Sequence, residues 1–414
     1  MHNTKAIILA AGLGTRMKSA LPKVMHEVGS KSLLERVICS LKNADIKDIV
    51  VVVGYKADLI KKAVNGVNFV EQKVLLGSGD AVKSALPEIR GFDGSILIAC
   101  GDMSLIKSGT YSDLVGKHVK SGASCTILTS EFPEPHGYGR IVRDKSGAVQ
   151  NITEEKDATP DEKKIKEINT GTYCFKSSVL SKYIGEIKEN TVKKEYYLTD
   201  IIGILSKNKE KVITVHCEKE EAMGINSRAD LAEANRVLNA KTLAGLMENG
   251  VTIVDPLTTW IAEGVNIGQD TVIFPNTVIE NDVRIGANCK IGPFARIRPG
   301  TKISDDVEIG NFVEICRTEI GEKTKVKHHT YLGDAVVGKN VNIGAGTITA
   351  NYDGKNKNRT VIKDNVFVGV GAVLIAPVEL GRSSVVGAGS VVTKNKNVPE
   401  GATVVGVPAR LFGK

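Results

Sequence analysis

The chain contains few aromatic residues and no long apolar segment. Aromatic side chains make up 5% of its 414 residues, and there is one tryptophan. No stretch approaches the roughly 20 consecutive apolar residues that a membrane-spanning helix requires. The first residues, from Met1 to Lys5, do not form the basic region and long apolar run that are typical of a secretion signal. These absences predict a cytoplasmic protein that does not bind to or span a membrane.

Cysteine is also sparse, and no pair has the C-x-x-C spacing of a metal site or redox motif. The count of seven is odd and the residues are widely dispersed, which argues against a disulfide framework and against a zinc site. We therefore expect reduced thiols, most of them buried. The cysteines are Cys39, Cys100, Cys125, Cys174, Cys217, Cys289 and Cys316.

The charge of the chain is only mildly unbalanced. The net charge is +8, and the basic runs are short, scattered and not interleaved with aromatic residues. A nucleic-acid groove needs a concentrated basic surface, so we expect small anionic molecules as partners and no nucleic acid. Most of these lysines are interpreted as solvated surface residues. With 42% hydrophobic and 25% charged residues, the chain is long enough for two domains with hydrophobic cores.

The first part of the chain alternates short apolar runs with amphipathic stretches. Helical patterns separate the first four of these runs. This alternation is typical of βαβ units and predicts a mainly parallel, Rossmann-like α/β sheet that is covered by helices. The less regular segment from residue 133 to 215 is assigned to the same domain. The expected strands are Ala6 to Ala10, Ile49 to Gly54, Phe69 to Gln72, Ser95 to Cys100 and Ala123 to Leu128.

A helix is expected to follow this domain. Ser227 and Asp230 resemble a capping box, and apolar residues recur at helical spacing until Asn249 and Gly250 end the pattern. The sequence therefore predicts an α/β domain at residues 1–227, a connector helix at 228–250 and a second domain at 251–414.

The second domain has a different period. Isoleucine occupies every sixth position from Ile267 to Ile315, nine times in succession, and aliphatic residues continue the spacing after an adjustment. Such a hexapeptide repeat is typical of the left-handed parallel β-helix, in which stacked rungs bury aliphatic side chains that one rung alone could not bury. The continuing positions are Ile320, Val326, Leu332, Ile362, Val368, Leu374, Leu380, Val386, Val392, Val398 and Val404. A polar interruption from Ala350 to Arg359 is predicted to be an exposed loop.

A glycine-rich motif follows the first predicted strand. The sequence from Leu9 to Met17 is L-A-A-G-L-G-T-R-M, and L-P-K ends at Lys23 shortly after. Glycine allows backbone N–H groups to approach a phosphate closely, and Arg16 and Lys23 can neutralise a triphosphate and the charge that develops at the attacked phosphorus. A Gly-x-Gly pair alone is more often a tight turn, whereas the whole string is specific.

This string resembles the sugar-1-phosphate nucleotidyltransferases, and further motifs follow in the order of one family. Those motifs are Gln72 with Leu76 to Gly79, Gly101-Asp102, Gly137 to Arg140, Glu154 to Ala158, Glu167 to Gly171, Glu195 to Asp200 and Gly224 to Asn226. Nearly the full chain resembles the bifunctional N-acetylglucosamine-1-phosphate uridylyltransferase/glucosamine-1-phosphate acetyltransferases. The resemblance implies acetyl transfer from acetyl-CoA to glucosamine-1-phosphate. Uridylyl transfer from UTP to N-acetylglucosamine-1-phosphate then releases pyrophosphate.

The resemblance also assigns roles in uridylyl transfer. Gln72 would select uracil, since a side-chain amide can pair with a carbonyl and an N–H of the base, and Arg16 and Lys23 would assist the reaction. The implied residues for UTP and the UDP-sugar are Leu9, Ala10, Ala11, Gly12, Gly14, Lys23, Gln72, Gly77, Ser78, Gly139, Glu154 and Asn169. Asp102 and Asn226 would hold Mg²⁺, because two protein oxygens together with phosphate oxygens and waters suit this ion. Alone, Asp102 would more often be a cap or surface acid, and Asn226 a turn residue.

Polar residues that the repeat does not need for folding indicate a second site. A lone histidine on a β-helix is usually an exposed turn residue, whereas His328 and His329 stand beside Tyr331. The resemblance assigns His328 as the general base that takes a proton from the sugar amine, because an ammonium has no lone pair to offer. The implied residues for the sugar phosphate and acetyl-CoA are Arg298, Tyr331, Asn342, Asn351, Tyr352, Lys357 and Ala388.

Several positions depart from the family's usual residues. Cys316 stands in place of a phosphate-binding lysine, and the neighbouring Arg317 is a candidate substitute, although side chains alternate along a strand. The other departures are Leu75 for glutamine, Ser78 for threonine, Ser104 for proline and Val370 for serine.

Three functional hypotheses follow from these observations. The leading one is the bifunctional enzyme, which the family's β-helix relatives imply to be a homotrimer with sites between subunits. The second is a monofunctional nucleotidyltransferase whose β-helix serves only trimerisation or regulation; His328, Asn342 and residues 351–357 argue against it. The third is a non-catalytic sugar-nucleotide sensor, against which the intact phosphate loop and Asp102 argue.

Overall fold

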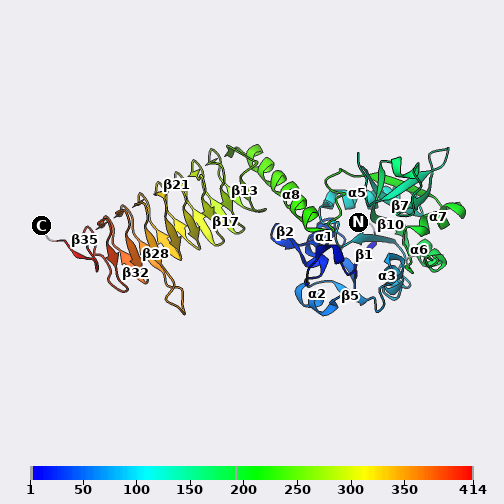
Figure 1. The fold of residues 1–414 in the computed structure, drawn as a ribbon, viewed down its shortest axis with the longest axis horizontal. Coiled ribbons are helices and arrows are strands. Elements are labelled where there is room, and N and C mark those ends of the chain that lie inside the picture. Colours follow the sequence, from blue (N-terminus) through cyan, green and yellow to red (C-terminus); the bar gives the residue numbers. More distant parts are fainter. Residues whose placement is uncertain (1–2, 192–193, 413–414) are drawn as a thin grey trace. The chain divides into compact units, whose positions relative to one another are not determined.

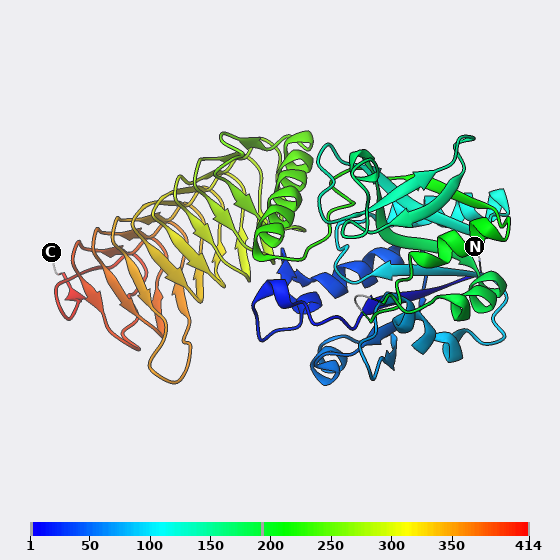
Figure 2. The same cartoon turned by 45° about the vertical axis from the view of Figure 1, so that its right-hand side comes forward.

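The computed structural model describes residues 3–191 and 194–412 and divides into two compact units, Met1–Arg236 and Val237–Lys414. Helix α8 (Arg228–Glu248) begins in the first unit and ends in the second. Figures 1 and 2 show an α/β unit and a unit of stacked coils, which are described separately below.

The α/β unit is built on a mixed sheet with the strand order β11-β7-β10-β6-β1-β4-β5. Strands β6, β1, β4 and β5 are mutually parallel, as are β11 and β7, whereas β10 runs antiparallel to both β6 and β7. The sheet is therefore mainly parallel, as predicted, with one inserted antiparallel strand. Its strands are β1 (Thr4–Ala10), β4 (Asp48–Val53), β5 (Asn68–Glu71), β6 (Ser95–Cys100), β7 (Cys125–Glu131), β10 (Glu167–Lys176) and β11 (Val212–His216).

Two further strands belong to this sheet, and one strand pair is separate from it. Strand β8 (Gly139–Arg143) pairs with β10 and with β9 (Val149–Thr153), so the irregular segment after residue 133 joins the same unit. Strands β2 (Glu27–Val28) and β3 (Lys31–Ser32) form a separate antiparallel pair.

Helices cover both faces of the main sheet (Figure 1). Successive residues of a strand point to opposite faces, so Ile8 packs with α1, α2 and α5, while Ile7 packs with α3, α6 and α7. This burial on both sides explains why the strands are nearly continuous apolar runs. The helical segments are α1 (Leu33–Asn43), α2 (Ala57–Ala63), α3 (Ser78–Ser84), α4 (Leu86–Ile89), α5 (Ser108–Ser121), α6 (Ser177–Tyr183), α7 (Asp200–Lys207), η1 (Thr15–Met17), η2 (Lys23–Met25), η3 (Glu162–Lys164) and η4 (Ile184–Glu186).

The second unit is a left-handed parallel β-helix with three sheets. The first sheet contains β12 (Thr252–Ile253), β15 (Val272–Ile273), β18 (Lys290–Ile291), β21 (Glu308–Asn311), β24 (Lys325–His328), β27 (Asn342–Ile343), β30 (Phe367–Val368), β33 (Val385–Val386), β35 (Thr403–Val405) and the antiparallel β36 (Arg410–Leu411). The second contains β13 (Trp260–Ile261), β16 (Val278–Ile279), β19 (Arg296–Ile297), β22 (Glu314–Cys316), β25 (Tyr331–Gly333), β28 (Ile348–Ala350), β31 (Val373–Ile375) and β34 (Val391–Val392). The third contains β14 (Asn266–Ile267), β17 (Val283–Ile285), β20 (Thr301–Ile303), β23 (Glu319–Ile320), β26 (Ala335–Val337), β29 (Thr360–Ile362) and β32 (Val378–Leu380).

The predicted hexapeptide positions form the core of the β-helix. Successive members, such as Ile273, Ile279 and Ile285, belong to the first, second and third sheets in turn. The strand of the next coil pairs with the strand before it in the same sheet, so Ile297 stacks on Ile279. From Ile273 to Val404, every predicted inward residue is at most 5% exposed, whereas Ile267 near the start of the stack is only partly buried.

The residue types also explain the conformation of the corners and the break in the repeat. Corner residues such as Asn276 and Asn288 have positive φ angles of 58° and 55°, a conformation that asparagine tolerates better than most side chains do. The residues between β28 and β29 form the predicted loop, which projects from the stack in orange in Figures 1 and 2. Within the loop, Tyr352 pairs with Lys357.

Strand β18 provides a test of the core, because Ile291 is fully buried while the adjacent Lys290 is exposed. We predict that Ile291→Ala lowers the free energy of unfolding of the β-helix by about 2–5 kcal/mol, since it removes buried apolar volume from a close-packed stack. Lys290→Ala should change it by less than about 0.5 kcal/mol. Urea denaturation followed by circular dichroism measures both changes, and equal losses would contradict the assignment of inward and outward positions.

Candidate active sites

A cavity of about 390 Å³ lies at the carboxyl ends of β1 and β6 in the α/β unit. These strands are adjacent and parallel, with Leu9 in register with Cys100, so the residues after both strands meet at one edge of the sheet. Ligands of α/β sheets bind at this edge. Of the predicted site residues, the lining includes Leu9, Ala10, Ala11, Gly12, Lys23, Gln72, Gly77, Ser78 and Asp102.

At two positions of the predicted UTP-binding segments, the backbone conformation and the neighbouring atoms require glycine. Gly14 has a φ of 62°, and a Cβ atom there would lie 2.6 Å from the Cβ of Lys23. Gly77 has a φ of 96°, and a Cβ atom there would lie 2.6 Å from the carbonyl oxygen of Tyr196. A larger residue at either position would therefore displace the loop that borders the cavity.

The predicted cationic and metal-binding residues meet beside this cavity. Lys23 Nζ forms an ion pair with Asp102 and donates a hydrogen bond to Asn226 Oδ1 at 3.0 Å. Arg16 donates to the same oxygen at 2.9 Å. The side chains of Lys23 and Asp102 are each 18% exposed, so solvent screens the pair only in part. The two oxygens predicted to bind a metal thus already converge on one cation, the Lys23 ammonium.

Gln72 is held in a fixed orientation. Its side chain is 4% exposed, and its Nε2 donates to the Gly77 carbonyl oxygen at 3.1 Å and to Asp80 Oδ2 at 2.7 Å. Because the amide nitrogen is used inside the protein, a base is left with the amide carbonyl oxygen, which can only accept. The sequence predicts that both the oxygen and the nitrogen of the Gln72 amide pair with the base. In the structure only the oxygen is free to do so.

The three residues predicted to hold the sugar phosphate also lie together. Gly139 is in register with Asn169, and a Cβ atom at Gly139 would lie 3.7 Å from Glu154 Oε1. Burial raises the pKa of the Glu154 carboxyl. Cys100 lines the cavity, and its thiol contacts the carbonyl oxygen of Gly171, two residues after Asn169, at 3.5 Å. Burial raises the pKa of that thiol to about 12, so it is neutral and is no nucleophile.

The segment from residue 195 to 200 contacts both the loop from Leu76 to Gly79 and the carboxylate of Glu154. The residue types of this segment do not indicate such a structural role. Tyr196 exchanges backbone hydrogen bonds with Leu76 and Gly79, at 2.7 and 2.8 Å. Thr199 donates its hydroxyl to Glu154 Oε1 at 3.1 Å. The segment therefore fixes the glycine loop on one side and the sugar-site carboxylate on the other.

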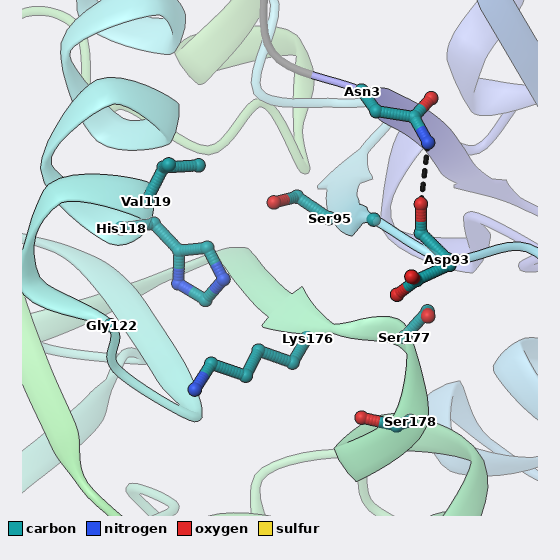
Figure 3. A pocket seen from close by; sticks show the side chains of 10 residues that line it. Asn3, Asp93, Ser95, His118, Val119, Gly122, Lys176, Ser177 and Ser178 are labelled. Carbon is teal, nitrogen blue, oxygen red and sulfur yellow. Dashed lines mark hydrogen bonds between the residues drawn. The ribbon is translucent and has the colours of Figure 1, made fainter.

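A second cavity, of about 430 Å³, lies at the opposite edge of the sheet. Figure 3 shows His118 and Lys176 extending into it, with Ser95 and Asp93 on another side. Asn3 precedes β1 and Ser95 begins β6, so this cavity lies at the amino ends of the parallel strands. Burial lowers the pKa of His118 to about 4, which leaves the ring neutral. Its position makes it the weaker candidate for a nucleotide.

In the β-helix, one ring nitrogen of His328 is held by a contact with an asparagine. The side chain is exposed, and its Nδ1 lies 2.8 Å from Asn311 Oδ1 on the neighbouring coil. An amide oxygen can only accept, so Nδ1 is the donor in this contact, which in a neutral ring leaves the lone pair on Nε2. His329 occupies a corner with a φ of 43° and stacks on Phe312, their ring centres 5.0 Å apart. The two histidines therefore have different surroundings.

Two arginines considered for the acetyl site are paired with carboxylates. Arg298 donates to Glu314 at 2.8 Å. Arg317 binds Asp334 through two hydrogen bonds of 2.6 and 2.9 Å, and these bonds hold the pKa of the Asp334 carboxyl below its usual range. Arg317, the candidate substitute for the lysine missing at Cys316, is thus already neutralised. Cys316 itself is buried, 2.7 Å from the Arg317 guanidinium.

The other residues predicted for acetyl transfer lie on more than one face of the β-helix. Asn351 donates to Asp334, and Tyr331 lies on the second sheet with Arg298 just after its strand β19. His328 and Asn342 belong to the first sheet. Tyr352 and Lys357 are in the projecting loop, and Ala388 is exposed after β33. One chain therefore does not gather all these residues on a single face.

Two further observations concern metals and membranes. Within residues 3–191 and 194–412, no group of three or more histidine, cysteine, aspartate or glutamate side chains is placed to hold a metal ion. In the same residues, no helix combines the length and apolarity needed to cross a bilayer.

Comparisons with known proteins match both units. The nucleotidyl transferase family matches residues 5–239, and the bacterial transferase hexapeptide family, of six repeats, matches residues 264–299, 282–317 and 359–394. The bifunctional protein GlmU of Carboxydothermus hydrogenoformans is 44% identical, covering 97% of both chains. The GlmU of Thermoanaerobacter pseudethanolicus is 45% identical, covering 98% of this chain and 95% of the relative.

A third relative, the GlmU of Pelobacter propionicus, is 41% identical over 98% of this chain and 96% of its own. Identity at this level along both units, added to the glycine-rich cavity and the hexapeptide coils, places the protein in the GlmU family of bifunctional uridylyltransferase and acetyltransferase enzymes.

Proposed function

We propose that this protein acetylates glucosamine-1-phosphate in its β-helix and joins N-acetylglucosamine-1-phosphate to UMP from UTP in its α/β unit. The observation that chiefly supports the uridylyl half is the convergence of Lys23, Arg16, Asp102 and Asn226 beside the glycine-lined cavity. The proposed domains are residues 1–227, the connector 228–250 and residues 251–414.

In the uridylyl site, Arg16 and Lys23 would bind the triphosphate and neutralise the charge that develops at the α-phosphorus. The sugar phosphate oxygen attacks that phosphorus, and the bond to the leaving pyrophosphate breaks. Gly139, Glu154 and Asn169 would hold the sugar in line, so that much of the rate enhancement comes from positioning.

Asp102 and Asn226 fit Mg²⁺, because their oxygens already converge on the Lys23 ammonium. When bound, Mg²⁺ supplies a positive charge that holds the phosphates and stabilises the pyrophosphate leaving group. The triphosphate gives Lys23 and Arg16 alternative anionic partners, so nucleotide binding favours release of the two metal-binding oxygens.

Base selection would depend on the Gln72 carbonyl oxygen. With its Nε2 bound to Gly77 and Asp80, this amide can accept the N3–H of uracil. Cytosine has no hydrogen at N3, which favours UTP over CTP. Leu75 and Ser78, where the family usually has glutamine and threonine, line the same cavity.

In the acetyl site, His328 Nε2 would take a proton from the amine of glucosamine-1-phosphate as the amine attacks the thioester carbonyl of acetyl-CoA. The C–N bond forms, the C–S bond breaks, and coenzyme A leaves as the thiol. Asn311 holds the ring in the productive tautomer through Nδ1.

We propose a homotrimer in which neighbouring chains complete the acetyl site. The predicted residues lie on more than one face of the β-helix, and hexapeptide repeats favour self-association. We also propose a cytoplasmic location, since all seven cysteines are free thiols.

Incubation of the full chain with glucosamine-1-phosphate, acetyl-CoA, UTP and Mg²⁺, followed by mass spectrometry, tests both halves. UDP-N-acetylglucosamine is the expected product. If the product forms only from preformed N-acetylglucosamine-1-phosphate, the enzyme is a monofunctional nucleotidyltransferase with a structural β-helix.

Asp102→Asn should nearly abolish uridylyl transfer while sparing acetyl transfer, because it removes one metal-binding carboxylate from one unit only. Rates of pyrophosphate release and of coenzyme A release, measured across a Mg²⁺ titration, separate the two reactions. Wild-type uridylyl rates at limiting Mg²⁺ would exclude Asp102 from the metal site.

His328→Ala should reduce acetyl transfer by about 10²- to 10⁴-fold, the usual contribution of a general base. Uridylyl transfer with preformed N-acetylglucosamine-1-phosphate should stay near normal. The fold should persist, since the buried Val326 and Leu332 are untouched.

His329→Ala is the matched control for this variant. His329 stacks on Phe312 at a corner, so its loss should cost far less acetyl transfer. If His329→Ala lost more acetyl transfer than His328→Ala, the alignment of this segment with the family's motif would be wrong by one residue.

A further inference from the structure

The N-terminus of helix α8 is closed by a reciprocal capping box. Asp230 N–H donates to Ser227 Oγ at 3.2 Å, and Ser227 N–H donates to Asp230 Oδ2 at 2.8 Å. The first N–H groups of a helix have no partner within the helix, and such a box satisfies two of them.

The same carboxylate oxygen accepts a further N–H that the helix does not require. Asn226 lies before the capping residue, and its N–H donates to Asp230 Oδ2 at 2.9 Å. Asp230 thus binds two successive peptide groups through one oxygen atom, and it holds the backbone of Asn226 as well as the start of the helix.

The segment before the helix is tied to the active site at several points. Gly224 N–H donates to the Tyr138 hydroxyl at 3.1 Å, and Ile225 N–H donates to the Asp102 carbonyl oxygen at 3.2 Å. With its own N–H held by Asp230, Asn226 directs Oδ1 toward Lys23 and Arg16. Rotation of this peptide would move the amide oxygen away from Asp102.

We propose that Asp230 is a positioning residue of the uridylyl site, which fixes the Asn226 peptide so that the Asn226 amide oxygen faces the cation position beside Asp102. The inference rests on the proposed role of Asn226 in metal binding. Asp230 does not touch the cation; it acts through Asn226.

Three variants separate positioning from the two other roles of this carboxylate. Asp230→Ala removes the acceptor, the charge and half of the capping box. Asp230→Asn keeps an oxygen that can accept both N–H groups but removes the charge. Ser227→Ala removes the other half of the box and leaves the hydrogen bond to Asn226 in place. Asn226→Ala serves as the reference for loss of the metal-binding oxygen.

Calorimetric titration of the full chain with UTP, once in Mg²⁺ and once in EDTA, gives the increase in UTP affinity that depends on the metal. We expect Asp230→Ala and Asn226→Ala each to reduce this increase by about tenfold, the equivalent of one hydrogen bond or metal contact. Asp230→Asn and Ser227→Ala should stay within about twofold of the wild type. UTP affinity in EDTA should be unchanged in Ser227→Ala, which leaves the Asn226 peptide and its contacts with Lys23 and Arg16 in place.

Several results would overturn the proposal. If Mg²⁺ raises the UTP affinity of Asp230→Ala as much as that of the wild type, Asp230 is not needed to position Asn226. An equal loss in Ser227→Ala would assign the effect to helix capping, and an equal loss in Asp230→Asn would assign it to charge. A wild-type increase in Asn226→Ala would remove the metal role of Asn226 and this inference with it, while uridylyl transfer by the wild type, measured separately, would still stand.

Thermal melting and acetyl transfer verify that each variant is folded. Both Asp230→Ala and Ser227→Ala should lower the melting temperature, because each breaks the same capping box. If Asp230→Ala and Ser227→Ala melt at the same temperature but differ in the metal-dependent increase in UTP affinity, that difference does not come from lost stability.

Discussion

Parallel pairing between strands determines where the polar groups of both sites meet. In the α/β unit, β1 and β6 are adjacent and parallel, so the glycine-rich segment after β1 and Asp102 after β6 emerge at the same edge. In the β-helix, each coil places its residues directly beside those of the next, which puts Asn311 beside His328 and Glu314 beside Tyr331. Residues far apart in sequence thus become neighbours without any loop having to bring them together.

The residues predicted for the uridylyl site are held in place by contacts within the protein. Lys23 and Arg16 occupy the oxygens of Asp102 and Asn226, which avoids leaving a half-buried carboxylate without a partner. Backbone contacts from Tyr196 and the hydroxyl of Thr199 fix the cavity walls. The cavity walls are therefore fixed by hydrogen bonds, whereas the predicted triphosphate-binding cations are held by contacts with Asp102 and Asn226.

The sequence predicts the framework of both units because burial has a clear period. Alternating apolar runs and the hexapeptide positions are set by the geometry of strands and coils, and they predict the strands and the core directly. The antiparallel insertion of β10 between β6 and β7 is not predictable in this way, since a buried strand has the same apolar pattern in either direction. The hydrogen bonds of Gln72 and the pairing of Arg317 with Asp334 depend on tertiary neighbours, which no local pattern specifies.

The departure at Cys316 shows how the electrostatics of the acetyl site are arranged without the usual lysine. Both candidate arginines are bound to carboxylates, Arg298 to Glu314 and Arg317 to Asp334. The side-chain exposures are 35% and 37% for the first pair, and 37% and 17% for the second. An exposed pair such as Arg298–Glu314 contributes only about 0–1 kcal/mol, whereas the bidentate pair of Arg317 with the more buried Asp334 is held more firmly. Of the two arginines, Arg298 therefore has the carboxylate partner that an anionic ligand would displace at the smaller cost.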